Sequence, residues 1–217
     1  MTEAEWLASD DLGRMLYFLR GQLSSRKGRL LACACYRRKW KYVTDERCRT
    51  AGDVAEAFAD DEDRIGDLDL VCETAWSARN EWLSKQGSQG RMVRIATAAH
   101  WLTRSEPACL TVASELARIP VDSARARSTE TAEQVRLLRD IFGNPFHPVA
   151  LDPAWRTEAV VGLARGAYED RAFDRLPVLA DALEDAGCAD GAVLAHCRGP
   201  GPHVRGCWVV DLVLGKT

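Results

Sequence analysis

The stretch SSRKGRLLACACYRRKWKYVTDERCRTAGDVAEAF, residues 24–58, carries two consecutive helix signals. A serine at 24 or 25 can cap the first helix and Thr44 or Asp45 the second, because a side-chain oxygen there accepts from unpaired N–H groups of the first turn. Apolar residues recur at helical spacing in both segments: Leu31, Ala34, Cys35 and Tyr42 in the first, and Cys48, Ala51, Ala55 and Phe58 in the second. The stretch therefore predicts two neighbouring amphipathic helices.

The same pattern, a capping residue followed by apolar residues at helical spacing, recurs along the chain and predicts an all-α fold of about ten helices. The strand–helix alternation of a doubly wound sheet and the Asn-Gly turns of hairpins are both missing from the sequence. We expect one compact multi-helix domain over 1–217, with a possible division into two packed subdomains at KQGSQG, residues 85–90. The last helix is expected over 202–214, although CWVVDLVLG within it is also typical of a strand.

Composition limits the class of protein. The chain has 217 residues, of which 47% are apolar, so it can bury a substantial core and does not resemble a disordered segment. It contains no apolar run near the roughly 18 residues that a membrane span needs, and its start, MTEAEWLASDD, lacks the features of a signal peptide. These features predict a soluble cytoplasmic protein without membrane contact, whose eight cysteines are reduced and mostly packed in the core.

The charge is nearly balanced overall but uneven along the chain. A formal net charge of −3 argues against a nucleic-acid partner, because such proteins usually carry a strong basic excess. Nine basic residues lie within 26–49, however, and nine acidic residues lie within 53–73. We expect the two segments to face each other as complementary helices; the alternative is a basic surface for phosphate or RNA. Within the basic segment, Arg37, Arg38 and Trp40 are the candidates for binding a partner.

The C-terminal segment holds the candidate metal ligands. Zinc prefers four thiolate or imidazole ligands in a tetrahedron, and Cys197, His203 and Cys207 lie within eleven residues of one another. Cys188 is the predicted fourth ligand, with His196 or His147 as alternatives. His203 and Cys207 are expected one turn apart on the last helix. The alternative interpretation places these cysteines in the core and treats RGPGPH as a turn between helices.

The sequence contains no recognisable catalytic motif. Neither HExxH nor a phosphate-binding GxxxxGK[ST] loop occurs, and the numerous carboxylates form no metal motif. We therefore expect a non-catalytic interaction or regulatory module with a protein partner and without a cofactor. The alternative is a small zinc-stabilised protein that binds nucleic acid through residues 26–49.

Several blocks together resemble a protein family expanded in planctomycete bacteria. They are MTEAEWLASDD, LLACACYRRKW, LLRDIFGNPF, AFDRLPVLADALEDAGC and AHCRGPGPHVRGCWVVDLVLGK. The resemblance covers roughly residues 1–60 and 135–217. That family has no established activity, so the resemblance implies membership and no particular function.

Overall fold

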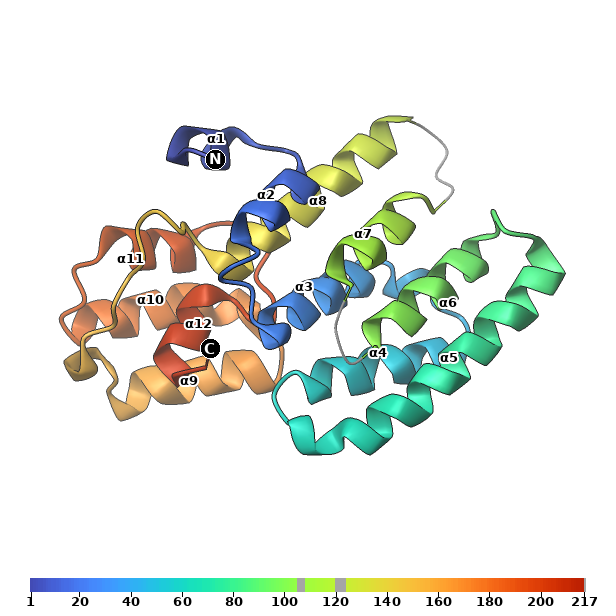
Figure 1. Ribbon diagram of the computed structural model, residues 1–217. Helices are drawn as coiled ribbons and strands as arrows, with labels where there is room; N and C mark the ends of the chain where they lie inside the picture. The colour runs from blue at the N-terminus through green and yellow to red at the C-terminus, as the bar shows by residue number, and fades with distance from the viewer. Residues whose placement is uncertain (105–107, 120–123, 217) are drawn as a thin grey trace. The chain divides into compact units, whose positions relative to one another are not determined.

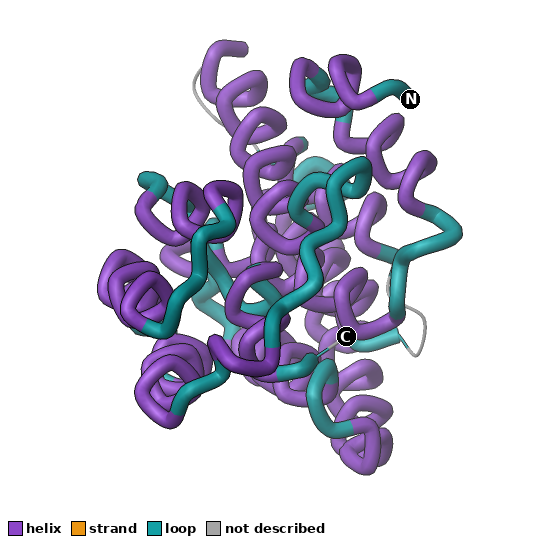
Figure 2. Tube along the Cα trace, turned by 90° about the vertical axis from the view of Figure 1, so that its left-hand side faces the viewer, coloured by secondary structure: helices purple, strands orange, loops and turns teal. Residues whose placement is uncertain are grey.

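The computed structural model describes residues 1–104, 108–119 and 124–216, and within these ranges it contains helices and loops but no strand (Figures 1 and 2). The all-α prediction is confirmed. The helices of this part of the chain are α1 (Glu3–Ala8), α2 (Leu12–Leu19), α3 (Ser25–Arg37), α4 (Glu46–Phe58), α5 (Ile65–Gln86), α6 (Arg91–Leu102), α7 (Cys109–Ala117), α8 (Ala124–Phe142), α9 (Glu158–Glu169), α10 (Leu176–Asp185), α11 (Gly191–Arg198) and α12 (Trp208–Leu214). Four short 3-10 turns join them: η1 (Trp40–Tyr42), η2 (Glu62–Arg64), η3 (Pro153–Trp155) and η4 (Phe173–Arg175).

The chain divides into two compact units, 1–135 and 136–217, and the boundary falls within α8. The expected subdivision at 85–90 instead lies inside the first unit, in the turn that joins α5 to α6. Among the helices that the structure describes, none combines the length and the apolar character needed to cross a bilayer.

In the first unit, α3 is the most buried helix. It packs against α4, α6 and α7, and every residue from 28 to 36 is buried. The sequence predicted one apolar face, but only the ends of α3 are charged, so the helix can be surrounded on nearly all sides. Arg29 is the one charged residue within the buried stretch 28–36. Its guanidinium donates to the Leu102 carbonyl at 2.6 Å and lies over the Phe58 ring.

The predicted caps of α3 and α4 are present. The Ser24 hydroxyl accepts from the Lys27 N–H at 3.2 Å, and the Asp45 carboxylate accepts from the Arg47 N–H at 3.0 Å. Each cap supplies a partner for a first-turn N–H group that the helix itself leaves unpaired.

The predicted charge complementarity between α3 and the acidic segment is also present. Arg37 pairs with Asp53 at 2.5 Å and with Glu56 at 2.6 Å, and Arg26 pairs with Asp60 at 2.9 Å. The basic segment therefore meets acids of its own unit.

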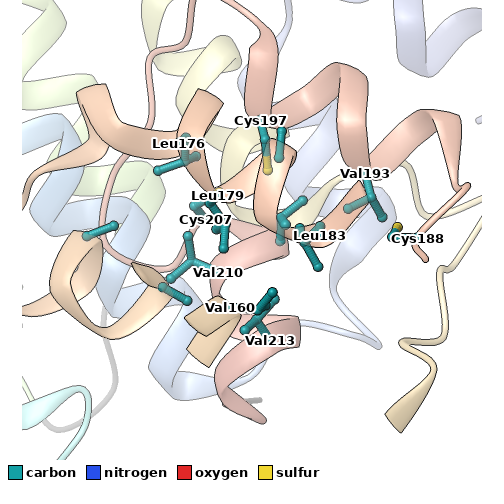
Figure 3. Packing of buried hydrophobic residues seen from close by; sticks show 14 of the residues in the cluster. Val160, Leu176, Leu179, Leu183, Cys188, Val193, Cys197, Cys207, Val210 and Val213 are labelled. Atoms are coloured by element: carbon teal, nitrogen blue, oxygen red, sulfur yellow. The ribbon is translucent and has the colours of Figure 1, made fainter. Parts of the chain in front are cut away.

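The second unit has its own apolar core, built by α9 to α12 (Figure 3). Helix α9 packs against α10 and α12, and α10 packs against α11. Cys188 and Cys197 lie in this core among Leu179, Leu183 and Val193.

The last helix begins later than the sequence predicted. It spans Trp208–Leu214, and residues 199–207 form a loop before it. The expectation of a helix from 202 was wrong, because Gly206, inside the expected helix, has φ +90°, which α-helical geometry does not allow. The strand alternative for CWVVDLVLG is wrong as well.

Candidate metal centre

Four side chains of the second unit converge on one point: Asp140, His196, His203 and Cys207. Each offers one ligand atom, and the four atoms all lie within 4.8 Å of one another. Asp140 comes from the last turn of α8, His196 from α11, and the other two from the loop before α12. Among the described residues, no other group of three or more His, Cys, Asp or Glu side chains meets this criterion.

Asp140 and His203 make the shortest contact in the cluster, and His196 contacts both Asp140 and Cys207. The Asp140 Oδ1 atom lies 2.7 Å from His203 Nδ1 and 3.2 Å from His196 Nε2. His196 Nε2 also lies 3.2 Å from the Cys207 Sγ. The two imidazole rings meet edge to face, with their centroids 4.8 Å apart.

Local backbone geometry brings these groups together. A Cβ atom at position 201 would lie 3.0 Å from the backbone nitrogen of His203 and 3.4 Å from its ring. Glycine is therefore required at position 201 for two reasons. The loop has a positive φ there, and a side chain would occupy the space beside His203. Helix α11 begins at the Asp190 cap, whose carboxylate accepts from the N–H groups of Ala192 and Val193.

Neighbouring groups hold the ligands in place. The Val204 N–H donates to the second oxygen of Asp140 at 3.0 Å, which leaves Oδ1 directed at the histidines. His203 Nε2 lies 3.4 Å from the Gly199 carbonyl, and the Trp208 ring lies 5.1 Å from that of His196. Metal-binding histidines commonly donate their second ring N–H to a carbonyl or carboxylate in this way.

The site is buried on one side and more accessible on the other. Cys207 is fully buried and the Asp140 side chain is 3% exposed, whereas the His196 side chain is 18% exposed. Burial, and next to it the charge of Asp140, raises the pKa of the Cys207 thiol well above its usual value. Burial alone would lower the pKa of His203, but its hydrogen bond to Asp140 and the charge there outweigh burial and raise it.

The spacing suits a tetrahedral ion of zinc's size. Metal–ligand distances of about 2.0 to 2.3 Å place the ligand atoms of a tetrahedron about 3.3 to 3.7 Å apart. The contacts of His196 with Asp140 and Cys207, both 3.2 Å, are close to this value. The 2.7 Å contact between Asp140 and His203 must open by roughly half an ångström or more, and any ligand atoms that lie near the 4.8 Å limit must move together by about 1 Å.

The structure brings together part of the predicted ligand set. His203 and Cys207 belong to the cluster, and so does His196, which was an alternative fourth ligand. Cys188 and Cys197 are instead packed in the apolar core and lie outside the cluster. Burial, and to a lesser degree Asp140, raises the pKa of the Cys197 thiol to about 12.

Two features of the cluster have no signal in the sequence. Asp140 lies in a different helix, far along the chain, and no local motif marks it as a ligand. His203 and Cys207 meet in an irregular loop, so the expectation that they lie one turn apart on a helix was wrong. The alternative fourth ligand His147 lies outside the group.

The predicted partner-binding residues contact other parts of the first unit. The Arg37 guanidinium lies 4.0 Å above the Trp40 ring while it pairs with Asp53 and Glu56. Arg38 pairs with Glu130 at 3.2 Å and with Glu133 at 3.3 Å. These contacts give all three residues a role within the fold.

One further Cys–His pair lies in the first unit. Cys72 is the one cysteine of the eight that is not buried, and its Sγ lies 3.5 Å from His100 Nδ1. Burial lowers the pKa of His100. Two ligands do not make a metal site, so this pair remains distinct from the cluster of four.

Fold and site together define an all-helical protein with a buried Asp–His–His–Cys cluster in its C-terminal unit. No protein-family model matches the sequence, and no curated protein or solved structure is significantly similar to it.

Proposed function

We propose that this protein binds one zinc ion through Asp140, His196, His203 and Cys207. The observation that carries the proposal is the convergence of four ligand atoms within 4.8 Å in a largely buried setting. One thiolate, two imidazoles and one carboxylate favour zinc over magnesium or calcium, which prefer oxygen ligands alone.

The role of the ion follows from the number of its protein ligands. Four protein ligands complete the tetrahedral shell of zinc, which is typical of structural sites, whereas catalytic sites keep a position for water. The ion would tie α8 to α11 and to the loop before α12, three segments that are separate in the sequence. Such a link stabilises a small unit whose apolar core is limited.

A structural zinc fits the non-catalytic interaction or regulatory role expected from the sequence. The nucleic-acid alternative has less support, because Arg26, Arg37 and Arg38 pair with carboxylates of their own unit.

We place the protein in a reducing compartment such as the cytoplasm, since all eight cysteines are free thiols. Membership of the planctomycete family is proposed on the blocks quoted above.

Zinc binding is tested on the full chain by native mass spectrometry after chelation and reloading. We expect one zinc per chain in the wild type, and loss of the ion in Cys207→Ser and His203→Ala, because each removes a ligand. Cobalt(II) gives a second readout, since thiolate-to-cobalt absorption should appear in the wild type and disappear in Cys207→Ser.

Two matched variants serve as controls. Cys197→Ser removes another buried thiol of the same core, and His147→Ala removes a histidine outside the cluster. Both should retain zinc. If Cys207→Ser lowers folding stability, the comparison is made between zinc-loaded and chelated samples of each protein, and only the wild type and the controls should gain stability from zinc. A wild type that binds no zinc refutes the proposal.

A further inference from the structure

A pocket of about 350 Å³ in the first unit has a cysteine and a histidine in its wall. Its lining residues are Cys72, Glu73 and Trp76 of α5, His100 of α6, and Arg104, which follows α6. Cys72 and Trp76 are one helical turn apart, which places them on the same face of α5, and α6 packs against this helix.

Cys72 differs from the other seven cysteines in being partly exposed. Burial raises the pKa of the Cys48 thiol and that of the Cys197 thiol to about 12, so both remain protonated near neutral pH. A thiol reacts as its thiolate, and only where a reagent can reach the sulfur. Cys72 therefore has the accessibility that the buried thiols do not have.

His100 lies within hydrogen-bond reach of this thiol. Its Nδ1 atom is 3.5 Å from the Cys72 Sγ and 3.4 Å from the carbonyl oxygen of the same residue. A cysteine nucleophile needs a base at such a distance to remove its proton. Once Nδ1 carries that proton, it can donate to the thiolate and to the carbonyl, which stabilises the imidazolium.

The surroundings of His100 keep the ring ready to accept a proton. Burial lowers the pKa of His100, the hydrogen bond to the Cys72 carbonyl opposes this, and the charges of Arg104 and Arg79 lower it further. The imidazole is therefore mostly neutral at pH 7, which is the form that acts as a base.

The other lining residues indicate which reagent fits. Trp76 is 46% exposed, and its ring lies 5.0 Å from that of His100, so it gives the pocket an apolar wall. Glu73 and Arg104 are exposed and carry opposite charges, which complement an ammonium group and a carboxylate. An amino acid carries both groups. The volume of about 350 Å³ is near the lower end of ligand pockets, so the reagent is small.

We infer that Cys72 is a site of thiol–disulfide exchange, with His100 as its base and a small disulfide of the cystine type as its reagent. The site lies entirely in the first unit, so the inference does not depend on the proposed zinc function.

The exchange needs no further oxidant, because the disulfide supplies the oxidising equivalent. Nδ1 of His100 takes the proton of the Cys72 thiol, and Sγ attacks one sulfur of the disulfide. The new S–S bond forms as the original one breaks, and the leaving half departs with the electron pair of that bond. It then takes the proton from the imidazolium and leaves as a thiol. Cys72 is oxidised and the leaving half is reduced, and another thiol reverses the reaction.

The site is tested by incubating the full chain with cystine at pH 7, followed by intact mass measurement and peptide mapping. We expect one half-cystine per chain, attached to Cys72 and released by added thiol. Mapping on the wild type does not depend on the folding of any variant. A wild type that is unmodified, or that is modified at other cysteines instead, refutes the inference.

Two variants complete this experiment. Cys72→Ser should remain unmodified. Cys48→Ala is the matched control, because it removes a buried thiol of the same unit, and it should react as the wild type does.

His100→Gln tests the role of the base through the pH dependence of the rate. An ordinary thiol with a pKa of about 8.5 is only a few per cent thiolate at pH 7, so loss of the base should slow modification about tenfold. At about pH 9 the thiol ionises without help, and the two rates should converge. A merely structural effect would lower the rate equally at both pH values, and that result contradicts the role of His100.

Two other disulfides test the class of reagent: cystamine, which carries ammonium groups only, and the uncharged bis(2-hydroxyethyl) disulfide. Each rate is divided by that of a free thiol with the same reagent, which removes differences in intrinsic reactivity. We expect the highest ratio for cystine. Arg104→Gln should lower that ratio about two- to fivefold, the effect of one exposed ion pair, and leave that of the uncharged disulfide unchanged. Equal ratios for the three reagents contradict a cystine-type reagent.

Discussion

At the scale of single residues, Asp45 shows how one side chain can stabilise several elements. Its carboxylate caps α4, accepts from the Arg47 guanidinium at 3.0 and 2.7 Å, and accepts from the indole N–H of Trp82 on α5 at 2.8 Å. The hydrogen bond from the Arg47 side chain is the main reason that the pKa of Asp45 is about 2, below the usual 3.8; burial opposes this, and Trp82 adds to it.

This arrangement predicts the pH dependence of an Asp45→Asn variant. The pKa is lower in the folded than in the unfolded state, so the charged carboxylate stabilises the fold above about pH 4. That contribution is lost as the pH falls from about 4 to about 2. Asparagine keeps the cap but not the charge, so the variant should be less stable than the wild type by about 1 to 2 kcal/mol at neutral pH and nearly equal to it at pH 2.

Urea unfolding at a series of pH values measures this difference. Asp11→Asn is the control, because Asp11 caps α2 through the Arg14 N–H at 3.0 Å and the substitution preserves that cap. If Asp45→Asn is less stable than the wild type by the same free energy of unfolding at pH 2 as at pH 7, the role assigned to the Asp45 charge is contradicted.

At the scale of elements, the ends of helices were more predictable than the irregular segments between them. Ser24 and Asp45 cap helices as expected, because an N-cap signal is local in sequence. The loop 199–207 was partly mistaken for helix, since its conformation depends on glycines whose φ values the sequence does not reveal. The same loop positions two of the four metal ligands.

The end of α8 gives a prediction at this scale. Gly143 follows the helix with φ +63°, and a Cβ there would lie 3.2 Å from the Trp208 ring, which in turn contacts His196. Gly143→Ala therefore combines backbone strain with crowding and should lower the free energy of unfolding by about 2 to 3 kcal/mol.

Gly187→Ala separates the effect of backbone strain from that of crowding. Gly187 follows α10 with φ +91°, but a Cβ there would have no neighbour within 4 Å. Its substitution should cost only the strain, about 1 to 2 kcal/mol in the same urea unfolding measurement. Equal losses in the two variants would show that Trp208 does not restrict position 143.

At the scale of the whole molecule, the chain forms two units that each bury their own apolar residues. The proposed zinc ion belongs entirely to the second unit, since all four ligands lie within 136–217. Loss of the zinc ion should therefore lower the stability of the second unit and not that of the first.

Hydrogen exchange of the full chain measures this difference. Chelation should reduce protection in α9 to α12 and leave α3 to α6 unchanged, because the ion constrains only the second unit. Cys207→Ser is the control and should not respond to chelation. An equal loss of protection in α3 to α6 would contradict a stabilising effect confined to one unit.

The sequence by itself determined the helical class, the caps, the pairing of basic with acidic segments, and the concentration of metal-binding residue types near the C-terminus. These features are local, because they depend on residue spacing along one or two turns of helix or on the charge of short segments. Only the tertiary structure decided which cysteines are core residues and which one faces a ligand cluster. Cys197 and Cys207 are both buried thiols, and they differ in that Asp140 and His196 approach Cys207 from other helices. Sequence spacing does not encode an approach between separate segments, which packing alone establishes.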